Sequence, residues 1–226
     1  NKIKDVENYL KNLLFSGEIT IEELENLSVR LRDELKQPKK KNTSSFSEVE
    51  VGWYAFAGGK FSPDSDAYPN CQGVVGWVNP DKNAPEGQRG LIITPDEVEM
   101  MWSDKYYETK IKDEYDGKGN TEKLIAYGKK CKINFPAAEW CVAYCKNGVR
   151  PGEGFMPAKE QLKRIVANRM IVNPALQKID GSELSGWIWS SSEYAYDRAW
   201  VVGARGGNVY DGSKYAGLYV RCVLAF

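Results

Sequence analysis

The hydrophobic positions in the first part of the chain have the spacing of α-helices. Residues 2–15 place five apolar side chains on one helical face: Ile3, Val6, Leu10, Leu13 and Leu14. A capping box of Thr20 and Glu23 then opens a second helix, whose apolar stripe comprises Leu24, Leu27, Leu31 and Leu35. The pattern predicts a helical hairpin over residues 1–37 and a solvated linker over residues 38–48.

The apolar stripe of the second helix has two interpretations. The hairpin packs against itself or against the main domain, as short amphipathic helices commonly do. Alternatively, because the stripe has near-heptad spacing, these helices associate with those of other copies and form a homo-oligomer.

From residue 49 onward the pattern changes to short strands between turns rich in Gly and Pro. Apolar runs predict strands over residues 51–56, 73–78, 90–94, 199–204, 208–210 and 218–226. The last of these runs has apolar side chains on both faces, which predicts a central position in its sheet.

Three prolines in this part mark predicted helix starts. Residues 94–97, Thr-Pro-Asp-Glu, combine a Thr cap with Pro at the first helical position and Glu at the third. Helices beginning at Pro136 and Pro157 have predicted buried faces that include Trp140, Val142 and Tyr144 in one and Leu162, Ile165 and Val166 in the other. Because strands and helices mix without regular βαβ alternation, we predict an α+β domain over residues 49–226.

The charge balance narrows the classes of function. Lys+Arg and Asp+Glu both total 31, so the formal net charge is zero and no basic field favours a nucleic-acid partner. The apolar runs are too short to span a bilayer, and the first residues are charged and amphipathic, unlike a signal peptide.

The five cysteines are an odd number, which excludes a complete disulfide framework. Cys141 and Cys145 are four apart on a predicted helix and would share its face. The chain has no His and no second Cys pair nearby. We therefore expect buried, inert thiols at these positions, and no metal site or cofactor.

A segment rich in Ser and aromatic residues, WSSSEYAYDRAW, occupies residues 189–200. Without a His base, and with no Lys suitably placed, its serines are not predicted to be nucleophiles. We expect Ser190–Ser192 to brace a turn through hydrogen bonds to the backbone. Arg221 interrupts an apolar strand and needs a partner, so we predict a partly buried ion pair between Glu193 and Arg221.

Three stretches resemble a C-terminal domain that is widespread in bacterial and phage surface proteins. These are GEGFMPAKEQL (152–162), NPALQKIDGSELSGWIWSSSE (173–193) and YVRCVLAF (219–226), and the resemblance extends over about residues 50–226. It implies a C-type-lectin-like fold and a variable protein of a diversity-generating retroelement, displayed on a cell surface or phage tail.

In such a system a template repeat is copied with errors at adenines, and the randomised side chains form an exposed ligand-binding face near the C-terminus. Changes at the adenines of an AAC codon give Tyr, Asp, Ser, Gly, Ala, Val, Arg or Leu, but never Trp or Lys. Between Tyr194 and Leu218 the only residues outside this set are Trp200 and Lys214. These two are therefore expected to be fixed scaffold.

The expected ligand-binding face is rich in Tyr, Arg and Asp, the composition of a paratope. Its candidate residues are Tyr194, Tyr196, Asp197, Arg198, Val201, Gly203, Arg205, Asn208, Tyr210, Asp211, Ser213, Tyr215 and Leu218. The alternative is that the tyrosines support loops and the charges are simply solvated.

Strand alternation gives a further expectation. If Trp200 and Val202 point to the core, Val201 and Gly203 point to solvent and join the binding face. We also expect Trp187, Trp189 and Trp200 to lie in the core.

Two other functions, one enzymatic and one of calcium-dependent sugar binding, are not supported by the residues. Formylglycine-generating enzymes share this fold class but use two closely spaced C-terminal cysteines, whereas Cys222 stands alone. Calcium-dependent lectins use Glu-Pro-Asn or Gln-Pro-Asp and Trp-Asn-Asp triplets, and the chain has none of these; Asn79-Pro80-Asp81 is a predicted turn. We therefore predict a non-enzymatic, adhesin-like domain that binds a protein or glycan, or alternatively a structural subunit of a surface fibre or phage tail.

Overall fold

The computed structural model describes Thr20 and residues 48–226. The chain divides into two compact units, residues 1–42 and 43–226. The predicted helical hairpin, its role in oligomerisation and nearly all of the predicted linker lie outside the described residues. Within the described part of the chain, no helix has the length and apolar character needed to cross a membrane.

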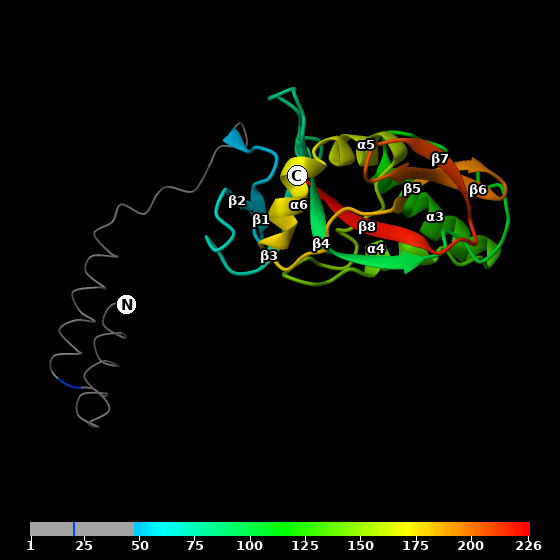
Figure 1. Cartoon of the computed structure of the whole chain (residues 1–226). Helices are drawn as coiled ribbons and strands as arrows, with labels where there is room; N and C mark the ends of the chain where they lie inside the picture. Colours follow the sequence, from blue (N-terminus) through cyan, green and yellow to red (C-terminus); the bar gives the residue numbers. More distant parts are fainter. Residues whose placement is uncertain (1–19, 21–47) are drawn as a thin grey trace. The chain divides into compact units, whose positions relative to one another are not determined.

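The second unit is built on one eight-stranded sheet (Figure 1). Its strands are β1 (Tyr54–Phe56), β2 (Lys60–Ser62), β3 (Cys71–Val78), β4 (Gly90–Met100), β5 (Trp187–Ala195), β6 (Arg198–Gly203), β7 (Val209–Ser213) and β8 (Leu218–Ala225), in the order β2-β1-β3-β4-β8-β5-β6-β7. Neighbouring strands are antiparallel except for β5 and β8, which are parallel. The last strand is central, as its two apolar faces predict.

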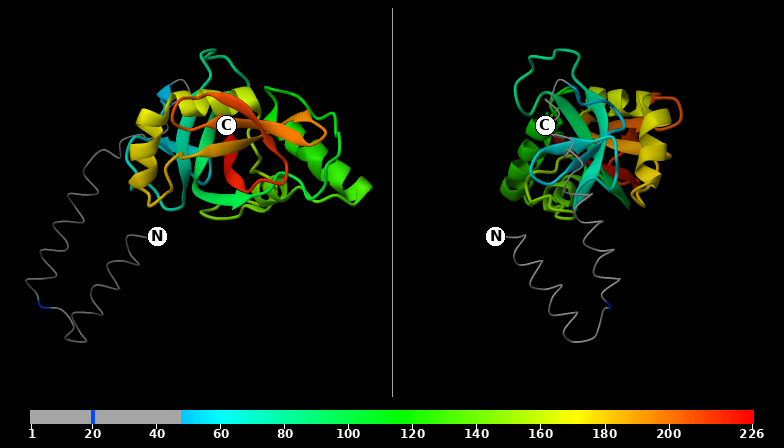
Figure 2. Two further views of the ribbon diagram at one scale, coloured as in Figure 1. Left: turned by 45° about the vertical axis from the view of Figure 1, so that its right-hand side comes forward. Right: turned by 90° about the vertical axis from the view of Figure 1, so that its left-hand side faces the viewer.

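In the described part of the chain, four helices cover the two faces of the sheet. They are α3 (Gly117–Cys131), α4 (Pro136–Ala143), α5 (Lys159–Ala167) and α6 (Arg169–Gln177). Buried side chains of α3 and α4 belong to one hydrophobic cluster, and those of α5 and α6 belong to another. The right-hand view of Figure 2 shows green α3 and yellow α5 and α6 on opposite sides of the sheet.

Strand residues alternate between these two clusters, as the period of two requires. Along β4, Ile92 faces the α3–α4 cluster, whereas Leu91 and Ile93 face the α5–α6 cluster. The predicted mixed α+β class is confirmed, and both faces of the sheet are buried over much of its area.

The helix start predicted at residues 94–97 is wrong. These residues continue β4, and the pairing with β8 is irregular between Ile93 and Glu97. Pro95 lies within this irregularity, where its missing N–H breaks no ladder bond. The Thr94 hydroxyl donates to the carbonyl of Cys222 at 3.0 Å and therefore braces the sheet instead of capping a helix.

The helix at Pro136 is confirmed, and the next helix begins at Lys159, two residues after Pro157. The predicted face of α5 is buried. In α4, however, the buried side chains are the small ones, Ala137, Ala138 and Cys141, while Trp140 and Val142 are only half-buried. Tyr144, just past the end of α4, is buried as predicted.

Cys145 is exposed beyond the end of α4, so it does not share a buried face with Cys141. Cys141 and Cys222 are the buried thiols, whereas Cys131 is exposed and Cys71 is half-buried. The expectation of buried thiols therefore holds for Cys141 and is wrong for Cys145.

Candidate recognition surface

The WSSSE segment forms part of β5 and is not a turn. Its three serines are fully buried. The Ser192 hydroxyl donates to the carbonyl of Asp113 at 2.6 Å and accepts from the Lys159 amide at 3.1 Å. The Ser191 hydroxyl accepts from the side-chain amide of Asn120 at 3.2 Å. The predicted turn is therefore wrong, but two serines do bond to the backbone: Ser190 accepts from the Ser192 amide at 3.3 Å, and Ser192 connects β5 to the starts of α3 and α5.

The predicted ion pair between Glu193 and Arg221 is wrong, because each residue has another partner. Glu193 binds Lys214 at 2.5 Å, and Arg221 lies 3.5 Å from Glu97. Ile188 pairs with Tyr219 across the parallel strands, so Arg221 is level with residue 190, about 10 Å along the strand from Glu193. The register of β4 and β8 instead places Glu97 directly opposite Arg221.

Glu193 and Lys214 form a buried ion pair in which every donor of the lysine is used. Lys214 Nζ donates to Glu193 Oε1 and to the carbonyls of Tyr107, at 2.8 Å, and Tyr196, at 2.9 Å. The Glu193 carboxylate also accepts from the backbone amides of Thr109, at 2.9 Å, and Lys110, at 2.8 Å. Burial lowers the pKa of Lys214, and the hydrogen bond to Glu193 opposes this effect.

Three exposed tyrosines gather above this pair, and we call them the tyrosine cluster: Tyr106, Tyr196 and Tyr215. The rings of Tyr106 and Tyr215 are stacked with centroids 3.9 Å apart, and Tyr196 meets Tyr106 edge-on at 6.3 Å. The hydroxyl of Tyr106 is hydrogen-bonded to that of Ser213 at 2.8 Å. Sequence reasoning missed Tyr106, which lies between β4 and α3; its only signal is an adjacent pair of tyrosines.

Charged side chains lie on β6 and β7 close to the tyrosine cluster. Arg198 donates to the Asp211 carboxylate at 2.7 Å and lies 4.0 Å from that of Asp197. The hydrogen bond to Asp211 raises the pKa of Arg198. Because Arg198 is paired with Ser213 across the hairpin, the salt bridge lies on the same face as the hydroxyl that binds Tyr106.

Two further aromatic pairs connect β5 with the hairpin of β6 and β7. Tyr194 packs against Trp200 at 4.5 Å, and the Lys159 ammonium lies 4.8 Å from the centre of the Trp200 ring. Tyr210 meets Trp187 edge-on at 5.0 Å. Tyr210 is paired with Val201, so it lies on the opposite face of the hairpin from Arg198.

The structure therefore divides the predicted binding face into parts. Tyr194, Tyr196 and Tyr210 are 46%, 59% and 57% exposed. Also exposed are Arg198, Arg205, Asn208 and Tyr215, whereas half-buried positions are Asp197, Gly203, Asp211, Ser213 and Leu218.

The expectation that Val201 is exposed is wrong. Alternation does place Val201 and Val202 on opposite faces, but both faces of the sheet are covered here, so both side chains are buried. Trp189 is in the core as predicted. Trp200 is half-buried and Trp187 is 39% exposed, so the prediction of a core position is wrong for Trp187.

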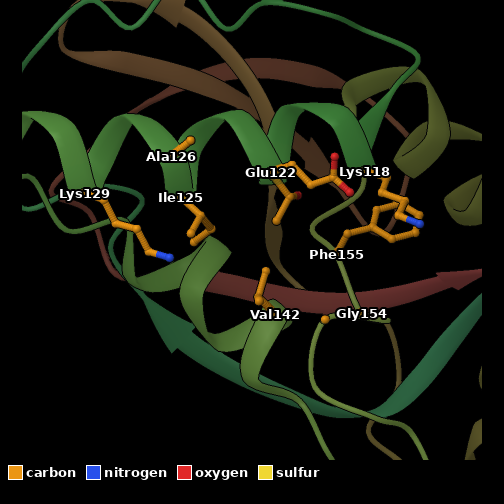
Figure 3. Close-up of a pocket in the computed structure, with 10 residues that line it drawn as sticks. Lys118, Glu122, Ile125, Ala126, Lys129, Val142, Gly154 and Phe155 are labelled. Atoms are coloured by element: carbon orange, nitrogen blue, oxygen red, sulfur yellow. The ribbon is translucent and has the colours of Figure 1, made fainter.

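The structure also contains cavities that the candidate residues do not line. One has a volume of about 330 Å³ and is lined by Lys118, Thr121, Glu122, Ile125, Ala126, Lys129, Val142, Gly152, Gly154 and Phe155. Figure 3 shows it beside α3. A second, of about 970 Å³, shares Lys118 and Phe155 with the first and extends over β1 and β2. In the described part of the chain, no group of three or more His, Cys, Asp or Glu side chains could hold a metal ion.

Comparison with known proteins finds similarity at the level of the fold only. No family model matches the chain, and no curated protein matches it. Among solved structures, the chain is similar to the crystal structure of a fimbrial protein from Bacteroides ovatus, with a TM-score of 0.63 and 19% sequence identity. The match covers 79% of this chain and 49% of the fimbrial protein, so the chain spans about half the length of that structure.

Proposed function

We propose that this chain is a non-enzymatic recognition domain with a C-type-lectin-like fold, displayed at a cell surface or on a phage virion. Its binding surface consists of the tyrosine cluster and the adjoining Arg198–Asp211 salt bridge. Tyr gives a large contact area at low cost in conformational entropy, and Arg pairs with carboxylates or stacks on rings. The partner is a protein or glycan.

One observation carries this proposal: the tyrosines of the segment 194–218 differ in exposure from Lys214, one of its two residues expected to be fixed. The tyrosines, which adenine-directed errors could introduce, are all exposed. Lys214, which such errors could not produce from AAC, is fully buried and holds Glu193. We therefore propose that this is a retroelement-diversified variable protein. The fimbrial neighbour supports the surface location.

A binding assay tests the recognition role. The fluorescently labelled chain is applied to a glycan array and to a panel of intact bacterial cells, and bound targets are compared between variants. Tyr215→Ala removes one stacked ring of the tyrosine cluster. We expect it to reduce binding at least tenfold, as loss of an aromatic hot spot does.

Tyr115→Ala is the matched control, because Tyr115 is 62% exposed and lies just before α3, outside the proposed surface. It should leave binding unchanged. Equal binding by the wild-type chain and the Tyr215→Ala variant would refute the proposed surface.

The alternative function is a structural subunit of a surface fibre, in which the same face packs against a neighbouring subunit. The fimbrial neighbour favours it as well. Under this alternative the purified chain would form fibres visible by electron microscopy, and Tyr215→Ala would prevent their assembly.

A further inference from the structure

The tyrosine cluster is assembled from three segments that are distant in the sequence. Tyr106 lies between β4 and α3, Tyr196 between β5 and β6, and Tyr215 between β7 and β8. The three side chains are exposed, and water competes for their hydroxyls, so hydrogen bonds at the surface contribute little to fixing the three segments relative to one another.

The buried ion pair bonds to each of these segments at the backbone. Lys214 Nζ donates to the carbonyls of Tyr107, the neighbour of Tyr106, and of Tyr196 itself. Tyr215 directly follows Lys214 in the chain. Lys214 therefore binds the backbone of Tyr196 directly and that of the residue next to Tyr106, and it is itself the residue next to Tyr215.

Further hydrogen bonds anchor the pair to the sheet. Glu193 is part of β5 and accepts from the amides of Thr109 and Lys110. The Lys214 amide donates to the Asp197 carbonyl at 2.9 Å, and its carbonyl accepts from Trp102 at 2.9 Å. The ammonium also lies 4.8 Å from the centre of the Trp102 ring.

We propose that the Lys214–Glu193 pair is a positioning element that holds Tyr106, Tyr196 and Tyr215 as one preorganised binding surface. Tyr106 then belongs to the recognition site although it lies outside the segment 194–218. The description of this surface as a recognition site rests on the proposed function, whereas the positioning itself does not. Preorganisation raises affinity because the loops lose little freedom on binding.

Hydrogen exchange of the wild-type chain is the first test. The amides of Thr109 and Lys110 donate to the buried carboxylate of Glu193, and the amide of Lys214 donates to the Asp197 carbonyl. These three amides should therefore exchange as slowly as those of the central strand β8. Exchange of these three amides at the rate of the exposed loop residues Gly58 and Gly59 would overturn the proposal.

A double variant, Glu193→Gln with Lys214→Met, is the second test. It removes both charges together, which avoids leaving one buried and unpaired. Met has no donors for the carbonyls of Tyr107 and Tyr196. In the double variant we expect the amides of residues 105–111 and 194–198 to exchange at least about tenfold faster than in the wild-type chain, because hydrogen bonds to a charged group are lost. The exchange rates of the β8 amides should not change.

Lys112→Met is the control, because it removes an exposed ion pair with Glu108 on the same segment. It should not change these rates. If the double variant exchanges like the wild-type chain in both segments, the positioning role is overturned. No partner is used, so this failure is distinct from failure of the recognition assay.

Discussion

Arg221 and Lys214, the two buried cations in the described part of the chain, each bind backbone carbonyls as well as a carboxylate. Arg221 donates to the carbonyls of Thr94 and Ser182, both at 3.0 Å, in addition to its contact with Glu97. Burial lowers the pKa of Arg221, and Glu97 opposes this effect. Hydrogen bonds offset part of the cost of burying a charge, so these carbonyls matter as well as the carboxylate; Arg221 Nε has no hydrogen-bond partner among the described residues.

Asp96, the neighbour of Glu97 in β4, makes a second charged contact. It accepts from the Tyr144 hydroxyl and from Lys146 Nζ, both at 2.5 Å. Burial alone would raise the pKa of Asp96, but the hydrogen bonds from Lys146 and Tyr144 lower it overall. The carboxylate therefore ties β4 to the end of α4 in its ionised form.

This lowered pKa predicts a pH-dependent contribution to stability. The contribution is fully present above the unfolded-state pKa of about 3.9 and is lost as pH falls through the lower folded-state value. Asp96→Asn should therefore be less stable than the wild-type chain at pH 7, with the difference shrinking between about pH 5 and pH 2. Urea denaturation of both proteins at several pH values measures this difference in the free energy of unfolding.

Asp66→Asn is the control, since Asp66 is exposed and, in the described part of the chain, is in no ion pair. A difference for Asp96→Asn that stays constant down to pH 2 would contradict the account.

The sequence indicated that the buried charges needed partners but not which partners they have. Arg221 was recognisable as a charge in an apolar strand. Its pairing with Glu97 depends on the β4–β8 register, which is offset by the irregularity at Pro95. Lys214 was recognised only as a residue outside the diversifiable set; its contact with Glu193 joins positions that no local pattern relates.

At the scale of elements, the segment 154–156 shows how closely the layers approach one another. Phe155 pairs with Val223 of β8 through two hydrogen bonds of 3.0 Å. A Cβ on Gly154 would lie 2.5 Å from both the Cys141 carbonyl and the Cys222 sulfur. Only Gly therefore lets this segment pass between α4 and β8.

Gly154→Ala should consequently destabilise the fold by about 1–3 kcal/mol, the usual cost of overpacking a close-packed site. Gly217→Ala is a matched control, because a Cβ there would meet no atom within 4 Å. It should be neutral or slightly stabilising, by up to about 1 kcal/mol. Thermal unfolding of the two variants distinguishes them, and equal midpoints would refute the packing argument.

Some elements could be predicted from local patterns and others could not. The last strand and the helix at Pro136 follow from apolar periodicity and a favourable proline. Residues 94–97 have the same local signature as Pro136, but pairing with β8 overrides it. The N-terminal cap of α3 is recognisable afterwards, because Asp116 accepts from the Gly119 amide at 2.8 Å. Three glycines within α3 weaken its helical pattern.

At the scale of the whole domain, the sheet provides a rigid frame and the hairpin of β6 and β7 forms one edge of it. The composition of the segment 194–218 predicted most of the exposed side chains in this region. It could not predict that Val201 is buried, because that depends on helices covering both faces. Nor could it predict Tyr106, which only the tertiary fold brings to Tyr215.

Within one short segment, the proposed diversified side chains are exposed and others are buried in the frame of the sheet. Exposed positions such as Tyr194, Tyr196 and Tyr210 tolerate many side chains, since surface substitutions change stability little. Buried positions such as Lys214 and Val201 do not, because core changes leave cavities or unpaired charges.

Sequencing of the gene's 3′ end in many cells of one population, together with the surrounding DNA, tests this claim most directly. We predict a near-identical repeat that differs at adenines, a nearby reverse transcriptase gene, and substitutions concentrated in the codons for Tyr194, Tyr196 and Tyr210. The codons for Lys214 and Val201 should be unchanged. Absence of the repeat, or substitutions spread equally over exposed and buried codons, would contradict the account.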